Sequence, residues 1–263
     1  ILFFSVFRTI TEKRHMPSLK GEKSELSVRG DIISSDNFKI ASSKKVYKAM
    51  IDTRYLDHDK EELFLNLFSI YSGIDYKTLK DKLAEGKKEP GSLVLSYSID
   101  SRSAKNLKEL AFKLIQLDVF ESKLINGAKI LRGLTISESG EKRTFSYNDT
   151  LTPVVGYISK FESESGKTKV NGIKGLEKNY NKVLNQSKDG ILQGDRDVLS
   201  YISFDKNSII RKRVDGATLN LNIPLKLQKN NEITLDMYKK KLSADEIIVS
   251  VMENKTGKII TMA

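Results

Sequence analysis

Apolar residues recur at three- and four-residue spacing between residues 59 and 71, and this pattern predicts an amphipathic helix. The apolar stripe and its borders consist of Leu63, Leu67 and Ile70, with Phe64 and Phe68 beside them. Asp57 or Asp59 can cap the N-terminus, because a short carboxylate accepts the unpaired N–H groups of a first turn. Residues 72–74, Ser-Gly-Ile, end the helix.

Two more helices are predicted, each from a capping residue followed by an apolar repeat. Asp75 can cap a helix that carries Leu79 and Leu83, with Gly86 where a C-terminal glycine belongs. Ser103 can cap the next helix. The apolar face of that helix would consist of Ala104, Leu107, Leu110, Ala111 and Leu114.

Strand-like patterns separate these helices. Residues 92–98 and 130–137 are typical of strands, and residues 209–223 predict a hairpin that turns at Asp215-Gly216. Helices and strands alternate irregularly and no repeat is visible. This favours an α+β fold with segregated sheets over a doubly wound parallel sheet.

The C-terminal third contains two more elements of each kind. Residues 175–184 predict a short amphipathic helix, and Pro224 suits the first turn of a helix that runs to about Leu242. Residues 246–262 predict a hairpin that turns at residues 254–257. Its strands are apolar on both faces, so we expect them to pair with further strands in a larger sheet.

The first 26 residues differ from the rest. Residues 1–7 are apolar and end at Arg8, a run too short to span a bilayer, which takes roughly 20 residues. From the residues alone, this run fits either the last two turns of a transmembrane helix or a buried first strand. Residues 11–26 are polar and contain Pro17 and Gly21, as in a linker or stalk.

Composition narrows the possible chemistry. Of 263 residues, 39% are hydrophobic and 30% charged, a globular composition. There is no cysteine, so thiolate metal sites are excluded, and the two histidines, His15 and His58, lack the spacing of metal ligands. We therefore expect neither a metal nor a cofactor.

The net charge of +11 admits a nucleic-acid-binding protein as an alternative. The best basic and aromatic patch for that alternative consists of Tyr201, Phe204, Lys206, Arg211, Lys212 and Arg213. Because the lysines are spread along the chain and mixed with acids, a solvated surface is the favoured interpretation. A protein beside anionic lipid or an anionic cell-wall polymer would carry the same balance.

Six segments carry short motifs in a recognisable order. The first spans residues 29–41 and keeps Arg29, Gly30, Ile32, Ile40 and Ala41. The others are Arg143-Thr144-Phe145-Ser146, Val154-Val155-Gly156-Tyr157, Gly172-Ile173-Lys174-Gly175-Leu176-Glu177, the segment 219–228 and the segment 256–263. Together they resemble the non-catalytic half of the class B penicillin-binding proteins.

The resemblance is incomplete at several positions. The family prefers Asp-Arg where this chain has Ser34-Ser35, and Gly where it has Asn37, although Asn tolerates a left-handed turn. The family's Arg-x-Tyr-Pro lacks its proline here, because Ser146 follows Phe145.

The resemblance implies a domain order. Residues 1–10 would be the end of a transmembrane anchor, 11–27 a linker, 28–218 a pedestal or dimerisation module, and 219–263 the incomplete start of a transpeptidase domain. The fold would be α+β: an elongated pedestal of short helices and small antiparallel sheets, followed by the first helix and hairpin of that domain.

The resemblance also implies structural motif positions and no catalytic residue. These positions are Arg29, Gly30, Ile32, Arg143, Gly172, Gly175 and Glu177. In the family the three charged segments lie together, so we expect Glu177 to be buried and paired with Arg29 or Arg143. The alternative is an ordinary helix-surface glutamate beside Lys174 or Lys178.

Four strings imitate the Ser-x-x-Lys, Ser-x-Asn and Lys-Thr-Gly motifs of penicillin-binding enzymes. They are Ser42-Ser43-Lys44-Lys45, Ser203-Phe204-Asp205-Lys206, Ser35-Asp36-Asn37 and Lys255-Thr256-Gly257. Their order is wrong, because Ser35-Asp36-Asn37 precedes the first Ser-x-x-Lys. Lys255-Thr256-Gly257 falls in a hairpin turn, whereas the catalytic version lies on a core strand. We therefore expect this chain to catalyse nothing.

The functional expectation is a non-catalytic pedestal that lifts a transpeptidase domain away from the membrane. The parent would be a serine-type peptidoglycan D,D-transpeptidase, with the cell-division type favoured over the elongation type. It would be a single-pass inner-membrane protein with its bulk in the periplasm. Implied partners are its own transpeptidase domain, a membrane glycan polymerase, division scaffold proteins and peptidoglycan, but not nucleic acid.

Overall fold

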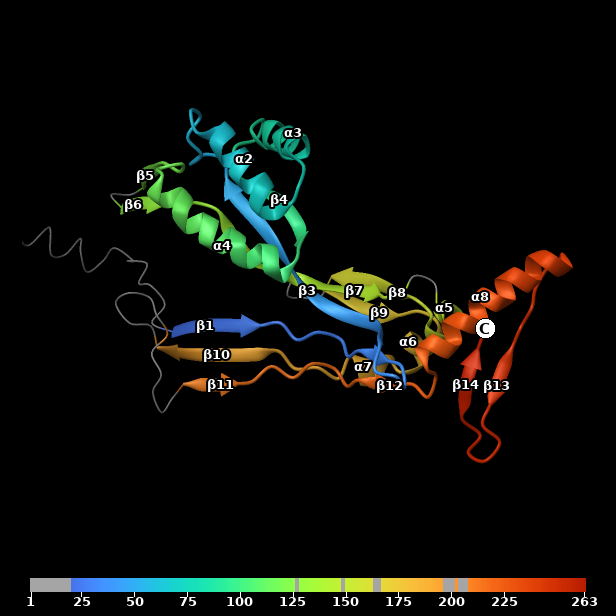
Figure 1. Ribbon diagram of the computed structural model, residues 1–263. Coiled ribbons are helices and arrows are strands. Elements are labelled where there is room, and N and C mark those ends of the chain that lie inside the picture. Colours follow the sequence, from blue (N-terminus) through green and yellow to red (C-terminus); the bar gives the residue numbers. More distant parts are fainter. Residues whose placement is uncertain (1–19, 126–127, 148–149, 163–166, 196–201, 203–207) are drawn as a thin grey trace, which may run out of the picture. The chain divides into compact units, whose positions relative to one another are not determined.

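The computed structural model describes residues 20–125, 128–147, 150–162, 167–195, 202 and 208–263 (Figure 1). The described chain is a mixture of helices and strands in several sheets, which confirms the α+β prediction. It forms two compact units, one within Ile1–Ser27 and Lys188–Val214, the other of Val28–Ser187 and Asp215–Ala263. The expected anchor at residues 1–10 lies outside the described residues.

The smaller unit is a three-stranded antiparallel sheet. Its strands, in the order in which they pair, are β1 (Lys20–Glu25), β10 (Gly190–Asp195) and β11 (Ile209–Arg211). The carboxylate of Asp189 accepts hydrogen bonds from both the backbone N–H and the hydroxyl of Ser27, at 2.7 and 2.6 Å. These bonds fix β1 beside the start of β10.

The predicted hairpin at residues 209–223 is wrong. The chain after β11 does not fold back on it, because Asp215-Gly216 is used for a close backbone crossing in the larger unit. Gly216 donates its N–H to the carbonyl of Val28 at 2.9 Å, and Asp215 accepts the N–H of Val28 at 3.0 Å. A Cβ at Gly216 would lie 1.7 Å from the carbonyl oxygen of Leu184, so only glycine fits.

The larger unit is built on a mixed seven-stranded sheet. Six strands pair in the order β12-β2-β3-β7-β9-β8, and β4 pairs with β3. The strands are β2 (Ile32–Ile33), β3 (Lys39–Asp52), β4 (Ser92–Ile99), β7 (Thr135–Phe145), β8 (Ile158–Glu162), β9 (Thr168–Gly172) and β12 (Leu219–Asn220). The long β3 pairs with β7 along most of its length, which joins two cores in one sheet. The predicted strand at 92–98 is confirmed.

Three helices pack on the second half of β3 and on β4. They are α2 (Glu61–Ser72), α3 (Tyr76–Gly86) and α4 (Ser101–Gln116). Two further short strands, β5 (Ser122–Ile125) and β6 (Ala128–Leu131), pair with each other. The predicted strand at 130–137 is instead divided between β6 and β7.

The buried face of α2 differs from the predicted stripe. Phe64, Leu65 and Phe68 are buried, whereas Leu63 is 43% and Ile70 76% exposed. The spacing of the apolar residues is correct for a helix, but it does not say which of two apolar faces meets the core. The aromatic face does, and Phe64 also packs against Phe120.

The predicted helix caps are partly correct. Asp75 caps α3 by accepting the N–H of Thr78 at 3.1 Å. For α4 the cap is Asp100, not Ser103, because the Asp100 carboxylate accepts the N–H groups of Arg102 and Ser103 at 2.8 and 3.0 Å. Gly86 ends α3 without a left-handed conformation, and a Cβ there would collide with Leu93.

The second core lies around β2 and the start of β3. It is covered by three short helices, α5 (Thr152–Val155), α6 (Gly175–Asn179) and α7 (Asn181–Leu184). The predicted helix at 175–184 is thus two helices divided at Tyr180. Leu184 is fully buried in this core.

The C-terminal elements agree with the prediction. Helix α8 (Leu225–Leu242) follows Pro224, and the strands β13 (Ser250–Met252) and β14 (Ile259–Met262) form an antiparallel hairpin. Of the helices in the described parts of the chain, none combines the length and apolarity needed to cross a membrane.

Candidate functional site

Three charged side chains meet in the interior of the larger unit. Arg29 comes just before β2, Arg143 lies on β7, and Glu177 lies on α6. The Glu177 carboxylate accepts from Nε of Arg29 through Oε2 and from Nε of Arg143 through Oε1, each at 2.8 Å. All three side chains have an exposed fraction of 0%. The predicted buried pair is therefore confirmed, with both arginines as partners.

The guanidinium of Arg29 uses its remaining donors on α6 and α7. Its Nη1 donates to Asn181 at 2.7 Å, and its Nη2 donates to the backbone carbonyl of Glu177 at 2.8 Å. Arg143 reaches back to the first motif, because its Nη1 donates to the carbonyl of Gly30 at 2.7 Å. Segments more than 100 residues apart are thus joined by hydrogen bonds from charged groups, the stronger kind in proteins.

A second carboxylate balances the charge. Glu141 is buried on β7, and its Oε2 accepts the backbone N–H of Arg29 at 2.8 Å. Burial lowers the pKa of Arg143, an effect that the neighbouring Glu177 opposes and that the positive charge of Arg29 reinforces. An arginine does not lose its proton in a protein, so the cluster holds two cations that need their anions.

Sequence reasoning missed Glu141 and Asn181. Glu141 and Arg143 are two residues apart on β7, so their side chains share one face of the strand. Once these residues are assigned to a strand, the spacing predicts that Glu141 lies beside Arg143. Asn181 lies four residues after Glu177, which is one helical turn, but the division into α6 and α7 hides this relation.

The glycines at the motif positions let the backbones of separate segments come into contact, because a side chain there would collide with the neighbouring backbone. A Cβ at Gly172 would lie 2.0 Å from the carbonyl oxygen of Glu177, and Gly175 has a φ of +64° at the start of α6. Gly30 donates its N–H to Leu184 at 2.9 Å, and Ile32 is fully buried on β2. Of the seven expected motif positions, Arg29, Arg143 and Glu177 thus form the cluster, Gly30 and Gly172 contact it through their backbones, Gly175 begins the helix that carries Glu177, and Ile32 lies in the second core.

The Ser35-Asp36-Asn37 string has a structural use. The carboxylate of Asp36 accepts the N–H groups of Leu225 and Lys226, at 2.8 and 3.3 Å, and so caps α8 from a distant turn. Burial raises the pKa of Asp36, but the hydrogen bonds from Ser34, Leu225 and Lys226 together lower it by more. The pKa of Asp36 therefore lies below its usual value. The contribution of this cap is therefore complete above the unfolded pKa and is lost as pH falls through the folded pKa.

Gln228 joins α8 to the C-terminal hairpin. Its side-chain oxygen accepts from the Thr261 hydroxyl at 2.6 Å and from the N–H of Met262 at 3.0 Å. Its amide nitrogen donates to the carbonyl of Met262 at 2.7 Å and to Glu232 at 2.8 Å. Gln228 is fully buried, and its amide uses four hydrogen bonds.

Replacing Gln228 with Met should loosen β14 while leaving α8 folded. The substitution keeps the volume but leaves the N–H of Met262 without a buried partner, at a cost of roughly 1–3 kcal/mol. We expect amide exchange at Met262 to accelerate about tenfold or more. Asn230→Met, on the exposed side of α8, is the matched control and should leave that exchange rate unchanged. Equal rates in the two variants would contradict the role of Gln228.

In the part of the chain that the structure describes, the strings that imitate the Ser-x-x-Lys and Lys-Thr-Gly motifs lie on different elements, one on β3 and one in the turn between β13 and β14. Ser42 lies on β3 within 3.2 Å of the Thr144 hydroxyl. Lys45 is three residues further along the strand, and therefore on its other face, where it pairs with Glu138 at 3.2 Å. The turn after β13 contains Gly257 with a φ of +71°, which confirms that Lys255-Thr256-Gly257 is not on a strand. The second Ser-x-x-Lys, at 203–206, lies outside the described residues.

This chain should therefore form no covalent adduct with a β-lactam. Acylation needs a serine whose proton can pass to a nearby base, and the Ser42 hydroxyl lies beside the Thr144 hydroxyl whereas Lys45 of the same motif is on the other face of β3. Intact-mass spectrometry after incubation with penicillin should show an unchanged mass. A stoichiometric adduct that disappears in Ser42→Ala would contradict this expectation.

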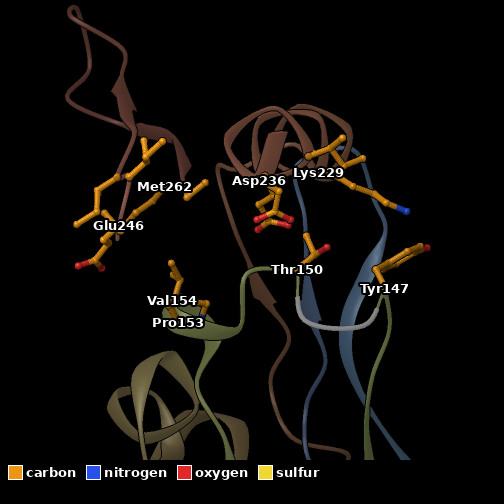
Figure 2. A pocket seen from close by; sticks show the side chains of 13 residues that line it. Tyr147, Thr150, Pro153, Val154, Lys229, Asp236, Glu246 and Met262 are labelled. Atoms are coloured by element: carbon orange, nitrogen blue, oxygen red, sulfur yellow. The ribbon is translucent and has the colours of Figure 1, made fainter. Parts of the chain in front are cut away.

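A groove of about 780 Å³ lies between α8, α5 and the C-terminal hairpin (Figure 2). Figure 2 shows Asp236 reaching from α8 toward Thr150, with Pro153 and Val154 on the opposite wall. Glu232, which also lines it, accepts the N–H of Leu151 at 3.0 Å. No serine, cysteine or histidine is among its described lining residues. Within the described chain, no cluster of three potential metal ligands is found.

Two arginines of the basic patch of the nucleic-acid alternative have partners within their own unit. Arg213 pairs with Glu25 at 2.9 Å, and Arg211 donates to the carbonyl of Asp189 at 3.0 Å. Tyr201, Phe204 and Lys206 lie outside the described residues.

Solved structures with the same fold are penicillin-binding proteins. Penicillin Binding Protein 2X from Streptococcus thermophilus matches with a TM-score of 0.65 and 15% identity, over 92% of this chain and 35% of that chain. The complex between Penicillin-Binding Protein (PBP2) and MreC from Helicobacter pylori matches with a TM-score of 0.55 and 18% identity, over 95% of this chain and 43% of that chain. This chain thus spans less than half the length of either protein. Comparison with curated protein sequences gives no match.

The fold is that of a module of penicillin-binding proteins. The family model described as Penicillin-binding Protein dimerisation domain matches residues 24–221, well over half of the chain. The chain belongs to this family, and the predicted resemblance is confirmed.

Proposed function

We propose that this chain is the pedestal of a peptidoglycan-cross-linking D,D-transpeptidase and that it acts as a structural and interaction module. The observation that carries the proposal is the Arg29–Glu177–Arg143 cluster inside a fold shared with penicillin-binding proteins. Its residues are buried and hydrogen-bonded, so they stabilise a scaffold and are inaccessible to a substrate.

We also propose the domain order expected from the sequence. Residues 28–218 form the pedestal, and 219–263 begin a transpeptidase domain whose parent acylates a serine with a D-Ala-D-Ala peptide. The capping of α8 by Asp36 supports this arrangement, because it ties the first helix of that domain to the pedestal. Residues 1–10 would end a single inner-membrane anchor and place the bulk in the periplasm.

The proposed partners belong to cell-wall synthesis, and we favour a role in cell division. One structural relative was solved in complex with MreC, which supports the idea that the pedestal meets other proteins. A membrane glycan polymerase, division scaffold proteins and peptidoglycan complete the proposed set.

The coding sequence beyond Ala263 tests the proposal. We expect about a further domain's length of sequence that contains Ser-x-x-Lys, Ser-x-Asn and Lys-Thr-Gly in that order. A fluorescent penicillin should label the chain extended by that sequence and leave residues 1–263 unlabelled. A different domain after Ala263, or an extended chain that takes no label, would refute the transpeptidase assignment.

A further inference from the structure

Helix α4 presents cations and large apolar side chains on the half that faces away from the core. Its buried half consists of Ala104, Leu107, Leu110 and Leu114. Its exposed half carries six residues that we call the α4 face: Arg102, Lys105, Lys108, Phe112, Lys113 and Ile115. Glu109 is the single acidic residue in the sequence of this helix. The α4 face is therefore a basic surface with apolar groups in it.

Four residues of the α4 face form one line along the helix. Lys105, Lys108, Phe112 and Ile115 follow one another at spacings of three or four residues, which keeps them on one side of a helix. The two lysines lie toward the N-terminal end of this line and the apolar pair toward its C-terminal end. Phe112 is 64% exposed and Ile115 41% exposed, so both contact water.

Within the described chain, none of the four cations of the α4 face lies at ion-pair distance from a carboxylate, although several other cations of the larger unit do. The ammonium of Lys108 lies instead 5.4 Å from the centre of the Tyr47 ring, and that of Lys113 lies 5.8 Å from the centre of the Tyr71 ring. An aromatic ring attracts a cation without neutralising it. The positive charge of the α4 face is thus left for an anion outside the described chain.

The stability of the helix does not account for these cations. The N-terminal end of a helix disfavours positive charge and the C-terminal end favours it. Arg102 lies in the first turn of α4, and of the four cations only Lys113 lies in the last turn. The lysine run at residues 239–241 is different, because all three of its members lie in the last turn of α8. The helix dipole therefore explains the run on α8 but not the charge on α4.

We propose that the α4 face rests on an anionic lipid bilayer. Its four cations complement negatively charged headgroups, and each cation near such a surface strengthens binding about fivefold. Phe112 and Ile115 would enter the boundary between headgroups and acyl chains, as apolar side chains of surface-bound helices do. A soluble polyanion would also pair with the cations, but it would leave Phe112 and Ile115 in water, and this difference favours the bilayer.

The contact should be weak and should depend on salt, because exposed charges supply most of it. The inference agrees with the proposed membrane anchor but does not rest on it, since it uses only the residues of α4. The sequence beyond Ala263 tests the transpeptidase assignment, so the two proposals fail separately.

A tryptophan placed in the α4 face tests the contact directly, because the chain has no tryptophan of its own. The emission of Phe112→Trp is measured with vesicles of phosphatidylglycerol and phosphatidylcholine in equal parts, some of them carrying bromine on the acyl chains. We expect the emission to shift to the blue and to be quenched by the brominated lipid. Both changes should be absent with vesicles of phosphatidylcholine alone.

Tyr238→Trp is the matched control, because Tyr238 is also an exposed aromatic residue beside a lysine, on α8. Its emission should stay unchanged. A change at Tyr238→Trp without one at Phe112→Trp would place the contact on α8 and overturn the proposal. Vesicle binding with no change at Phe112→Trp would overturn it as well, because the contact would then lie elsewhere, for example at the apolar residues 1–7.

Co-sedimentation of the 263-residue chain with the same vesicles tests the charges. Replacing Lys105 and Lys108 together with Gln should weaken binding about tenfold or more. Replacing Lys239 and Lys240 with Gln removes the same charge from α8, and it should change binding about twofold or less because salt screens distant charges. Equal losses in the two double variants would mean that net charge alone matters, and the α4 face would be refuted.

Phe112→Ser separates a bilayer from a soluble polyanion, for which heparin serves as the probe. The variant should bind the vesicles more weakly, because its apolar group no longer enters them, and should bind heparin as strongly as the unchanged chain. Unchanged binding to the vesicles would show that Phe112 does not enter the lipid, and the bilayer would have to be given up as the partner of the α4 face.

Discussion

Replacing Glu177 with Gln should lower the free energy of unfolding by about 3–5 kcal/mol, the range for removing one member of a buried ion pair. The cost should lie at the upper end of that range, because Glu177 contacts two guanidinium groups at once. Without its charge, the guanidinium groups of Arg29 and Arg143 remain buried near each other, and like charges in a poorly solvated site repel strongly.

Glu162→Gln is the matched control. Glu162 lies exposed at the end of β8, where loss of a charge changes stability by at most about 0.5 kcal/mol. Thermal and urea unfolding of both variants measure the difference. Indistinguishable midpoints would mean that the cluster contributes nothing to stability.

The C-terminal hairpin should exchange its amide protons much faster than α2, from about Ala244 onward. All residues of β13 are exposed, and Ile248 and Met252 are 72% and 62% exposed. A two-stranded hairpin is marginal in water, and each uncovered Ile or Val forfeits roughly 1.5–3 kcal/mol of burial. Gln228 holds β14 at only two residues, so it does not replace a sheet neighbour.

Deleting residues 244–263 should also improve solubility, because the exposed strands offer free edges for pairing between molecules. Hydrogen exchange measured by mass spectrometry compares the hairpin with the segment 63–70 of α2. Equal protection in the two segments would show that the hairpin is stable without further strands. The prediction that the hairpin belongs to a larger sheet would then have to be abandoned.

Local signals in the sequence were enough to predict several elements. Asp75 before an apolar repeat, Pro224 before a long helical pattern and Gly257 between two β-branched runs each fix a helix start or a turn through their own backbone chemistry. The resemblance to the family also predicted the charged cluster, because in that family the three segments that carry these residues lie together.

Signals that depend on distant contacts were misread. Asp215-Gly216 has the composition of a hairpin turn, but the pair serves a crossing with Val28 and Leu184 that no local pattern encodes. The face of α2 was assigned to Leu63 and Ile70, because periodicity identifies a stripe and not its partner.

The sequence by itself determined that this is an α+β penicillin-binding-protein module and that Glu177 is buried and paired with Arg29 or Arg143. The helix starts and turns follow from side chains that act on the backbone within one turn. The module and its buried carboxylate follow from motifs that resemble those of a known family. Only the tertiary structure decided that Glu141 and Asn181 complete the cluster, that Asp36 caps α8 and that Gln228 holds β14. Each of these bonds joins separate elements whose approach depends on the packing of the whole unit, because a hydrogen bond acts only over about 3 Å.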